Sequence, residues 1–213
     1  MIIITNAAQA APRDPVRVVE AALRAGAPAV QLRQKGASAR DLFLTAVRLR
    51  QLTLEHGALL FVNDRMDVAL ASEADGVHLG PDDPTPAAVR STVPEGFLIG
   101  YSADNPGTAR SAIAAGADYI GCGAVWPTSS KRDAGPAIGL DGLRRVAQAV
   151  PAPVVGIGGI TPRRAGPVRA TGASGVAVMG AVMSAANPGK TVRRLLAAVD
   201  GGDQAPAEPA PPR

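Results

Sequence analysis

The feature that most constrains the fold is a regular alternation of short apolar runs with longer amphipathic segments. Eight apolar runs recur along the 213 residues, at 2–5, 29–33, 59–63, 76–80, 97–102, 119–123, 154–158 and 175–180. Between most of them the apolar residues are three and four positions apart, as in "SARDLFLTAVRLRQLTLEHG" and "GKTVRRLLAAVD", which is the spacing of one helix face. The chain is therefore predicted to alternate strands and helices.

The return from helix to strand carries a repeated phrase, a glycine followed by an apolar run. It occurs in "RAGAPAVQL", "EHGALLFV", "AAGADYIG" and "ATGASGVAV", and glycine just after a helix readily adopts the left-handed conformation that ends it. The eight apolar runs, each followed by a connecting segment, predict an α/β protein with a compact (β/α)₈ TIM barrel. An open doubly wound sheet is the alternative, but no G-x-G-x-x-G opens a helix after the first strand.

The domain organisation and location follow from composition. With 46% hydrophobic and 19% charged residues, the chain is typical of a globular protein, and we expect one catalytic domain over residues 1–200. Residues 201–213 are rich in Pro and Ala without periodicity and predict a disordered tail. No apolar run is long enough for a membrane helix, and the single cysteine, Cys122, fits a reducing compartment. We therefore expect a cytoplasmic protein without a membrane partner.

The charge of the chain alone does not identify its ligand, but nucleic-acid binding is not favoured. The net charge is +4, carried mainly by scattered arginines, and aromatic residues make up only 3% of the chain. Few rings are thus available to stack on bases, whereas a handful of cations aimed at a phosphorylated small molecule gives the same balance. The sequence leaves the oligomeric state open, a homo-oligomer included.

In a (β/α)₈ barrel the catalytic residues lie at the carboxyl ends of the strands. In this chain, polar residues occur at several of these predicted positions. The second run leads into "QLRQK", which puts Gln31, Arg33 and Lys35 at alternate positions and hence on one face of a strand. An amide and two cations suit an anionic ligand. A solvated strand end is the other interpretation of this motif alone.

Two aspartates follow neighbouring strands. Asp64 comes after Asn63 at the end of the third run, and Asp83 follows the fourth run beside Asp82. Mg²⁺ typically takes one or two carboxylates and leaves its other positions to water and phosphate oxygens, so Asp64 and Asp83 could share such an ion. Each aspartate alone would more simply be a helix cap. His78, inside the fourth run, is interpreted as a core residue.

The later strand ends carry hydroxyls and glycines. Ser102 ends the fifth run, and the sixth leads into "AVWPTSSK", with three hydroxyl residues before Lys131. The seventh ends in "GIGGIT" and the eighth in "AVMGAVM". Glycines let backbone N–H groups approach a phosphate, which barrels often bind after their last two strands. Tight packing between helix and strand would also explain them.

Taken in this order, the motifs "VQLRQK", "VNDRMDVALASEADGVHLG", "GADYIGCGAVWPTSSK", "PVVGIGGIT" and "ASGVAVMGAV" resemble the thiamine phosphate synthase family over about residues 2–199. The resemblance implies a (β/α)₈ barrel that uses Mg²⁺ to join 4-amino-5-hydroxymethyl-2-methylpyrimidine diphosphate to the phosphate of hydroxyethylmethylthiazole, releasing diphosphate. It also implies a dissociative substitution without a protein nucleophile.

The resemblance further implies the roles of particular residues. The pyrimidine diphosphate would be bound by Gln31, Leu32, Arg33, Gln34, Lys35, Asn63, Ser102 and Lys131, of which Arg33, Lys35, Ser102 and Lys131 would be catalytic. The thiazole phosphate would be bound by Thr128, Ser129, Ser130, Gly159, Met179 and Gly180, and Mg²⁺ by Asp64 and Asp83.

The chain departs from the family pattern at three positions. Pro81 stands where many relatives have Gln, Asp104 where a His is common, and Gly180 where a Ser is frequent. The related thiazole tautomerases share the barrel but use that His and tend to lack the metal aspartate at Asp83. They are the first alternative. A barrel that binds a phosphorylated ligand without catalysis is the second.

Overall fold

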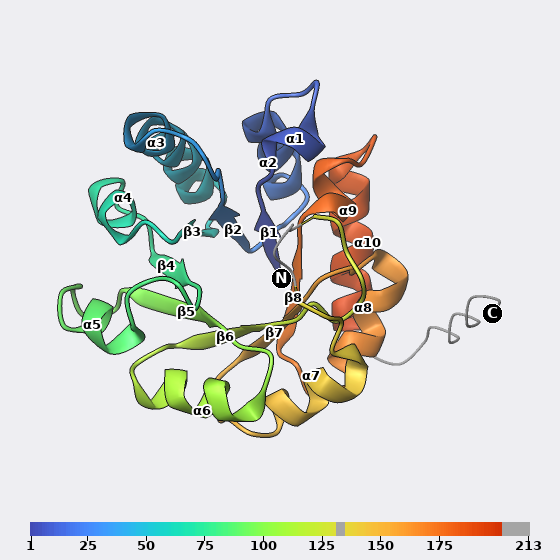
Figure 1. Cartoon of the computed structure of the whole chain (residues 1–213). Coiled ribbons are helices and arrows are strands. Elements are labelled where there is room, and N and C mark those ends of the chain that lie inside the picture. Colours follow the sequence, from blue (N-terminus) through green and yellow to red (C-terminus); the bar gives the residue numbers. More distant parts are fainter. Residues whose placement is uncertain (131–134, 202–213) are drawn as a thin grey trace.

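The computed structural model describes residues 1–130 and 135–201 and contains a closed barrel of eight parallel strands (Figure 1). The strands are β1 (Ile2–Ile4), β2 (Ala29–Leu32), β3 (Leu59–Asn63), β4 (Gly76–Leu79), β5 (Leu98–Ser102), β6 (Tyr119–Cys122), β7 (Val154–Ile157) and β8 (Gly175–Val178). Neighbours pair in sequence order, and β1 closes the barrel against β8. The predicted (β/α)₈ barrel is thus confirmed.

Helices form a ring outside the strands (Figure 1). They are α1 (Ala7–Ala10), α2 (Pro15–Leu23), α3 (Ala39–Glu55), α4 (Met66–Ala71), α5 (Pro86–Arg90), α6 (Pro106–Ala114), α7 (Gly139–Ala147), α8 (Pro162–Arg169), α9 (Gly180–Met183) and α10 (Pro188–Asp200). The short α1 and α9 lie directly after β1 and β8, so they belong to the end of the barrel where the strands finish.

The strands read as continuous apolar runs because both of their faces are buried. In β1, for example, Ile2 and Ile4 line a cavity inside the barrel. Ile3, between them, is fully buried and points to the opposite face, toward the helices, since side chains alternate along a strand. Cys122 in β6 is also fully buried. Burial and the charge of Asp104 raise the pKa of its thiol to about 12.

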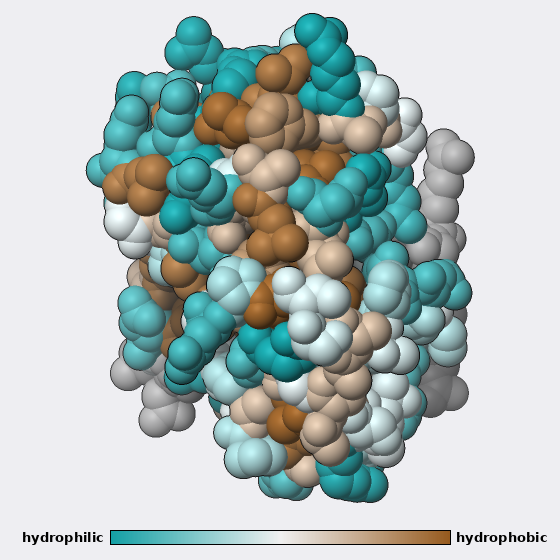
Figure 2. All heavy atoms as spheres, turned by 90° about the vertical axis from the view of Figure 1, so that its left-hand side faces the viewer, coloured by the Kyte–Doolittle hydropathy of each residue, from teal (hydrophilic) through white to brown (hydrophobic). Residues whose placement is uncertain are grey.

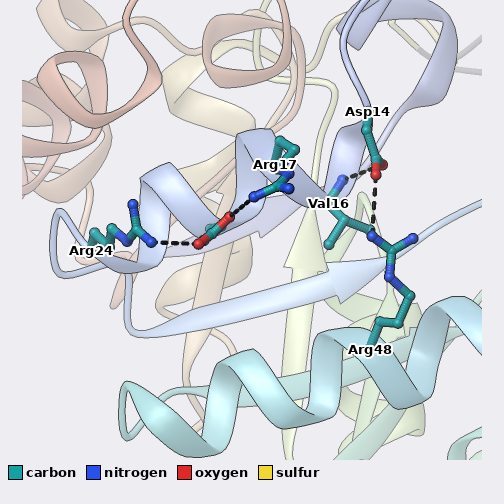
Figure 3. Close-up of polar contacts among 6 residues, drawn as sticks. Asp14, Val16, Arg17, Arg24 and Arg48 are labelled. Carbon is teal, nitrogen blue, oxygen red and sulfur yellow. Dashed lines mark hydrogen bonds and ion pairs between the residues drawn. The ribbon is translucent and has the colours of Figure 1, made fainter.

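Side-chain caps fix where the helices begin. Asp14 accepts a hydrogen bond from the Val16 N–H at the start of α2 (2.9 Å) and also pairs with Arg48 of α3 (3.2 Å), as Figure 3 shows. Such a cap stabilises a helix start by about 1 kcal/mol. Thr161 occupies the N-cap position of α8, with Pro162 next, but its hydroxyl makes no capping hydrogen bond.

The outer surface mixes polar and apolar side chains. On the face that carries α3 and α4, apolar spheres form a narrow strip between polar ones (Figure 2). The large apolar side chains exposed on the described part of the chain are Leu44, Leu54, Leu59 and Leu70. Within residues 1–130 and 135–201, no helix combines the length and the apolar character needed to cross a bilayer.

Candidate active site

A cavity of about 400 Å³ opens at the carboxyl ends of the strands. It collects residues from strand ends that are far apart in the sequence. Of the residues singled out from the sequence, its walls contain Gln31, Arg33, Asn63, Ser102, Thr128, Ser130, Gly159, Met179 and Gly180. The size suits a ligand of small-molecule dimensions.

The alternation along β2 divides its predicted residues between two environments. Gln31 lines the cavity, whereas Leu32 and Gln34 line a smaller pocket of about 110 Å³ beside α2 and α3. Arg33 lines both. Leu32 is almost completely buried, so its side chain is part of the packing between strand and helices. Thr5 fixes the backbone of Arg33: its hydroxyl donates to the Arg33 carbonyl (3.1 Å) and accepts from the Arg33 N–H (2.8 Å).

The aspartates predicted to bind metal are brought together. Burial, the charge of Asp83 and a hydrogen bond with Asp83 raise the pKa of Asp64 to about 6, against the opposing charges of Lys35 and Arg33. Asp83 also accepts the Gly80 N–H (2.7 Å), which fixes its loop. Asp64 has a left-handed backbone (φ 64°), which is uncommon for a residue other than glycine and is often found at functional sites.

This arrangement fits a divalent cation. The raised pKa of Asp64 shows that its carboxylate lacks sufficient positive charge nearby, and Mg²⁺ uses one or two carboxylates together with phosphate oxygens. No cluster of three or more His, Cys, Asp or Glu side chains suited to a metal is present within residues 1–130 and 135–201.

A chain of polar side chains crosses the cavity wall. The His78 ring contacts the Tyr119 hydroxyl through Nδ1 (3.0 Å) and the Ser102 hydroxyl through Nε2 (3.0 Å). Burial raises the pKa of Tyr119 well above its ordinary value, an effect that a hydrogen bond with Gln31 partly offsets, so the phenol is neutral. His78 is buried, as predicted for a core residue, but it also lines the cavity and orients Ser102.

The loops after β6 and β7 are bound tightly to each other. The Trp126 N–H donates to the Gly158 carbonyl (3.2 Å). Arg164, at the start of α8, donates to the Gly159 carbonyl (2.9 Å), and its guanidinium lies 4.9 Å from the centre of the Trp126 ring. In the same loop Thr128 accepts the Ser130 N–H (3.2 Å). The hydroxyl residues and the glycine loop therefore form one wall.

Gly159 should be intolerant of any side chain. Its φ is +64°, and a Cβ there would lie 2.7 Å from Trp126 Cβ and 3.1 Å from the Pro127 carbonyl oxygen. We expect Gly159→Ala to lower the free energy of unfolding by about 3 kcal/mol, from left-handed strain and overpacking together. Gly57→Ala is the matched control, with φ +62° and no atom within 4 Å, and should lose only about 1 kcal/mol. Urea unfolding measures both, and equal losses would contradict the contact with Trp126.

Not all of the predicted residues that the structure describes line the cavity. Lys35 and Ser129 are exposed, and the cavity walls do not include them. Lys131 lies outside the described residues. Asp104 and Pro81, two of the departures from the family pattern, line the cavity.

Tyr119, His78 and Thr108 are wall residues that sequence reasoning did not assign to the site. The signal for His78 was its place in β4, two residues before the loop that leads to Asp83. A polar residue inside a buried strand needs a partner, but the partner, Tyr119, comes from β6 and is not evident from the sequence.

The chain is similar to known proteins over most of its length. The family model described as thiamine monophosphate synthase matches residues 1–182. A thiamine-phosphate synthase from Natronomonas pharaonis is 46% identical over 202 residues, covering 93% of this chain and 94% of the relative. One from Moorella thermoacetica is 48% identical over 184 residues, covering 86% and 87%.

A solved structure is similar over nearly the whole chain. The thiamine phosphate pyrophosphorylase from Pyrococcus furiosus superimposes with a TM-score of 0.86 at 41% identity, covering 95% of this chain and 96% of its own. Sequence and structure thus point to the same group of enzymes.

Proposed function

Since this chain belongs to the thiamine monophosphate synthase family and is a transferase, we propose that its cavity joins 4-amino-5-hydroxymethyl-2-methylpyrimidine diphosphate to the phosphate of hydroxyethylmethylthiazole and releases diphosphate. The observation that supports this proposal is that two groups of hydrogen-bond donors, from different strand ends, line one cavity. Arg33 and Ser102 lie on its walls together with Thr128, Ser130 and the glycine loop. Two phosphorylated substrates therefore have separate places to bind.

The pyrimidine diphosphate is assigned to the side of the cavity that β2, β3 and β5 form. Arg33 offers a fork of donors to phosphate oxygens, and its backbone is fixed by Thr5. Ser102, oriented by His78, and Asn63 add uncharged hydrogen-bonding groups. Lys35 and Lys131 complete the positive charge that a departing diphosphate needs.

The thiazole phosphate is assigned to the opposite side. Thr128, Ser129 and Ser130 follow β6, Gly159 follows β7, and Met179 and Gly180 follow β8. Hydroxyls and backbone N–H groups are donors, which suits a group whose oxygens accept hydrogen bonds. Members of both groups line the same cavity, so bound substrates would be held close enough to react.

Mg²⁺, held by Asp64 and Asp83, would neutralise negative charge on the diphosphate as it leaves. The protein contributes positioning and a field of donors and needs no nucleophile of its own: Cys122 is buried with a raised pKa and is not suited to covalent chemistry. The proposed bond change is the loss of diphosphate from the pyrimidine methylene carbon, followed by attack of the thiazole nitrogen.

We also propose that the enzyme is cytoplasmic, because its single cysteine fits a reducing compartment.

The test is direct turnover. Purified protein is mixed with both substrates and Mg²⁺, and diphosphate and thiamine phosphate are measured, with a chelator in the parallel sample. We expect equal amounts of both products and none with the chelator. Binding of the thiazole phosphate without turnover would contradict the synthase and favour a barrel that binds its ligand without catalysis.

The same protein should be offered the thiazole carboxylate phosphate isomers. We expect no isomerisation, because Asp104 occupies the cavity wall at the position where the tautomerase relatives carry a histidine. Isomerisation without thiamine phosphate formation would favour the tautomerase.

A further inference from the structure

Gln9, in α1, contacts a residue of the cavity wall. Its side-chain Nε2 donates a hydrogen bond to the Ser130 hydroxyl oxygen (2.9 Å), although the two residues are 121 positions apart. Ser130 itself lines the cavity, whereas Gln9 is not among the residues that do. Gln9 therefore acts on whatever the cavity binds only through its neighbour.

The position of Gln9 is fixed by other contacts of the same segment. Asn6 caps α1 by accepting the Gln9 N–H (3.1 Å), and its amide contacts the Met179 sulfur (3.2 Å). Arg13, which follows α1, donates to the carbonyls of Met183 (2.6 Å) and Ala185 (2.7 Å). The turn that carries Gln9 is thus attached to the end of β8 and to α9.

Gly180 makes room for this contact. A Cβ at position 180 would lie 3.1 Å from Ser130 Oγ, 3.3 Å from Gln9 Oε1 and 3.4 Å from Gln9 Nε2. The first two distances are tighter than ordinary van der Waals contact. Gln9 and Ser130 together therefore occupy the space that a side chain at position 180 would need.

The hydrogen bond sets the direction in which Ser130 can donate. A serine hydroxyl has one hydrogen and can accept through its lone pairs. Because Ser130 Oγ accepts from Gln9, its own hydrogen remains available to the cavity. The Gln9 carbonyl oxygen is one of two buried side-chain N or O atoms without a hydrogen-bond partner among the described residues, so the contact with Ser130 is made by the amide nitrogen alone.

We propose that Gln9 is a positioning residue that directs the Ser130 hydroxyl as a donor toward the phosphate of the thiazole substrate. The inference rests on the proposed function for the identity of that phosphate. It predicts that the polarity of the side chain at position 9, and not only its shape, determines the affinity for one of the two substrates.

Gln9→Ala and Gln9→Glu test this through the KM of each substrate. Alanine removes the donor, and we expect the KM for the thiazole phosphate to rise about tenfold, the effect of one hydrogen bond to a charged group. Glutamate keeps the shape but accepts the Ser130 hydrogen and adds negative charge, so its effect should be larger than that of alanine. The KM for the pyrimidine diphosphate should stay within about twofold in both.

If Gln9 had a purely structural role, Gln9→Ala would raise the KM more than Gln9→Glu, because glutamate fills the space of glutamine and alanine does not. Gln51→Glu on the exposed surface of α3 is the matched control and should leave both KM values unchanged. If the wild type makes thiamine phosphate but both Gln9 variants keep its KM values, or alanine is the worse of the two, the inference is overturned. If the wild type makes no product, the proposed function fails first.

A double variant gives a second test. Gly180→Ser alone crowds Gln9 and Ser130 and should raise the KM for the thiazole phosphate. In the Gln9→Ala background the same serine has room, and its hydroxyl can donate into the cavity, so the KM should return toward the wild-type value. Additive effects of the two changes would contradict the shared space, since contacting residues are expected to couple.

Discussion

Replacement of Asp83 by asparagine should reduce metal-dependent turnover by about a hundredfold, the size of effect seen when an electrostatic contribution to the transition state is removed. Asparagine has the shape of aspartate, and its carbonyl oxygen can still accept the Gly80 N–H that Asp83 accepts at 2.7 Å. The loop is therefore expected to keep its conformation. What is lost is the negative charge beside Asp64, on which the binding of Mg²⁺ is proposed to depend.

Turnover at increasing Mg²⁺ concentration measures this effect. The variant should need more Mg²⁺ and should not reach the wild-type rate. Asp82→Asn is the matched control, because the neighbouring aspartate is exposed and makes no described contact with Asp64; it should behave as wild type. Wild-type kinetics in Asp83→Asn would remove Asp83 from the site.

Asp64→Asn should remove activity and at the same time stabilise the metal-free protein. The pKa of Asp64 is raised from 3.8 to about 6 in the folded state by burial and by Asp83. The folded state therefore holds this proton between pH 4 and 6 while the unfolded state releases it. Stability falls as pH rises through this window and stays reduced above it, because the ionised form is the less favourable one in the fold.

Asparagine cannot ionise, so the variant avoids this loss. The Asp64 carboxyl is only partly buried and solvent screens its charge, so we expect a gain of about 1 kcal/mol at pH 7 that disappears below pH 4. Asparagine also tolerates the left-handed backbone at φ 64° well, but that contribution does not depend on pH. The pH-dependent part therefore isolates the carboxylate.

Urea unfolding of both proteins from pH 4 to 8, with a chelator present, provides the measurement. Added Mg²⁺ should then stabilise the wild type and not the variant, since ligand binding to the folded state adds to its stability. An Asp64→Asn protein that is less stable than wild type at pH 7, or that responds equally to Mg²⁺, would contradict a metal site at this pair.

Most of the fold could be predicted because each strand and helix carries a local signal. The strands are apolar on both faces and short, and glycines such as Gly57, which follows the His56 C-cap of α3, mark the return from helix to strand. Once eight units are counted, the barrel follows, because parallel strands with right-handed helical connections close in sequence order.

The site could be predicted in part for a similar reason. In a barrel, the residue at the end of each strand points to one common opening, so Arg33, Asn63 and Ser102 could be placed there without knowing any distance. Alternation within a strand also separates Leu32 from Gln31, so only Gln31 of the two lines the cavity.

Sequence reasoning could not find the contacts that depend on two distant segments. The partners of His78 come from β5 and β6, and the Ser130 hydroxyl is held by a residue 121 positions away. No local pattern encodes such pairs, because a hydrogen bond depends on atoms within about 3 Å of each other and on no feature of either segment alone.

By itself, then, the sequence determined the order of strands and helices, the barrel that they close, and the kinds of groups at each strand end, since these follow from residue type and spacing. Only the tertiary structure decided how those groups act on one another. The proton affinity of Asp64 depends on Asp83 from the loop after β4, and the donor direction inferred for Ser130 depends on Gln9. Charge interactions and hydrogen bonds act through space, so their strength is set only when folding brings the partners together.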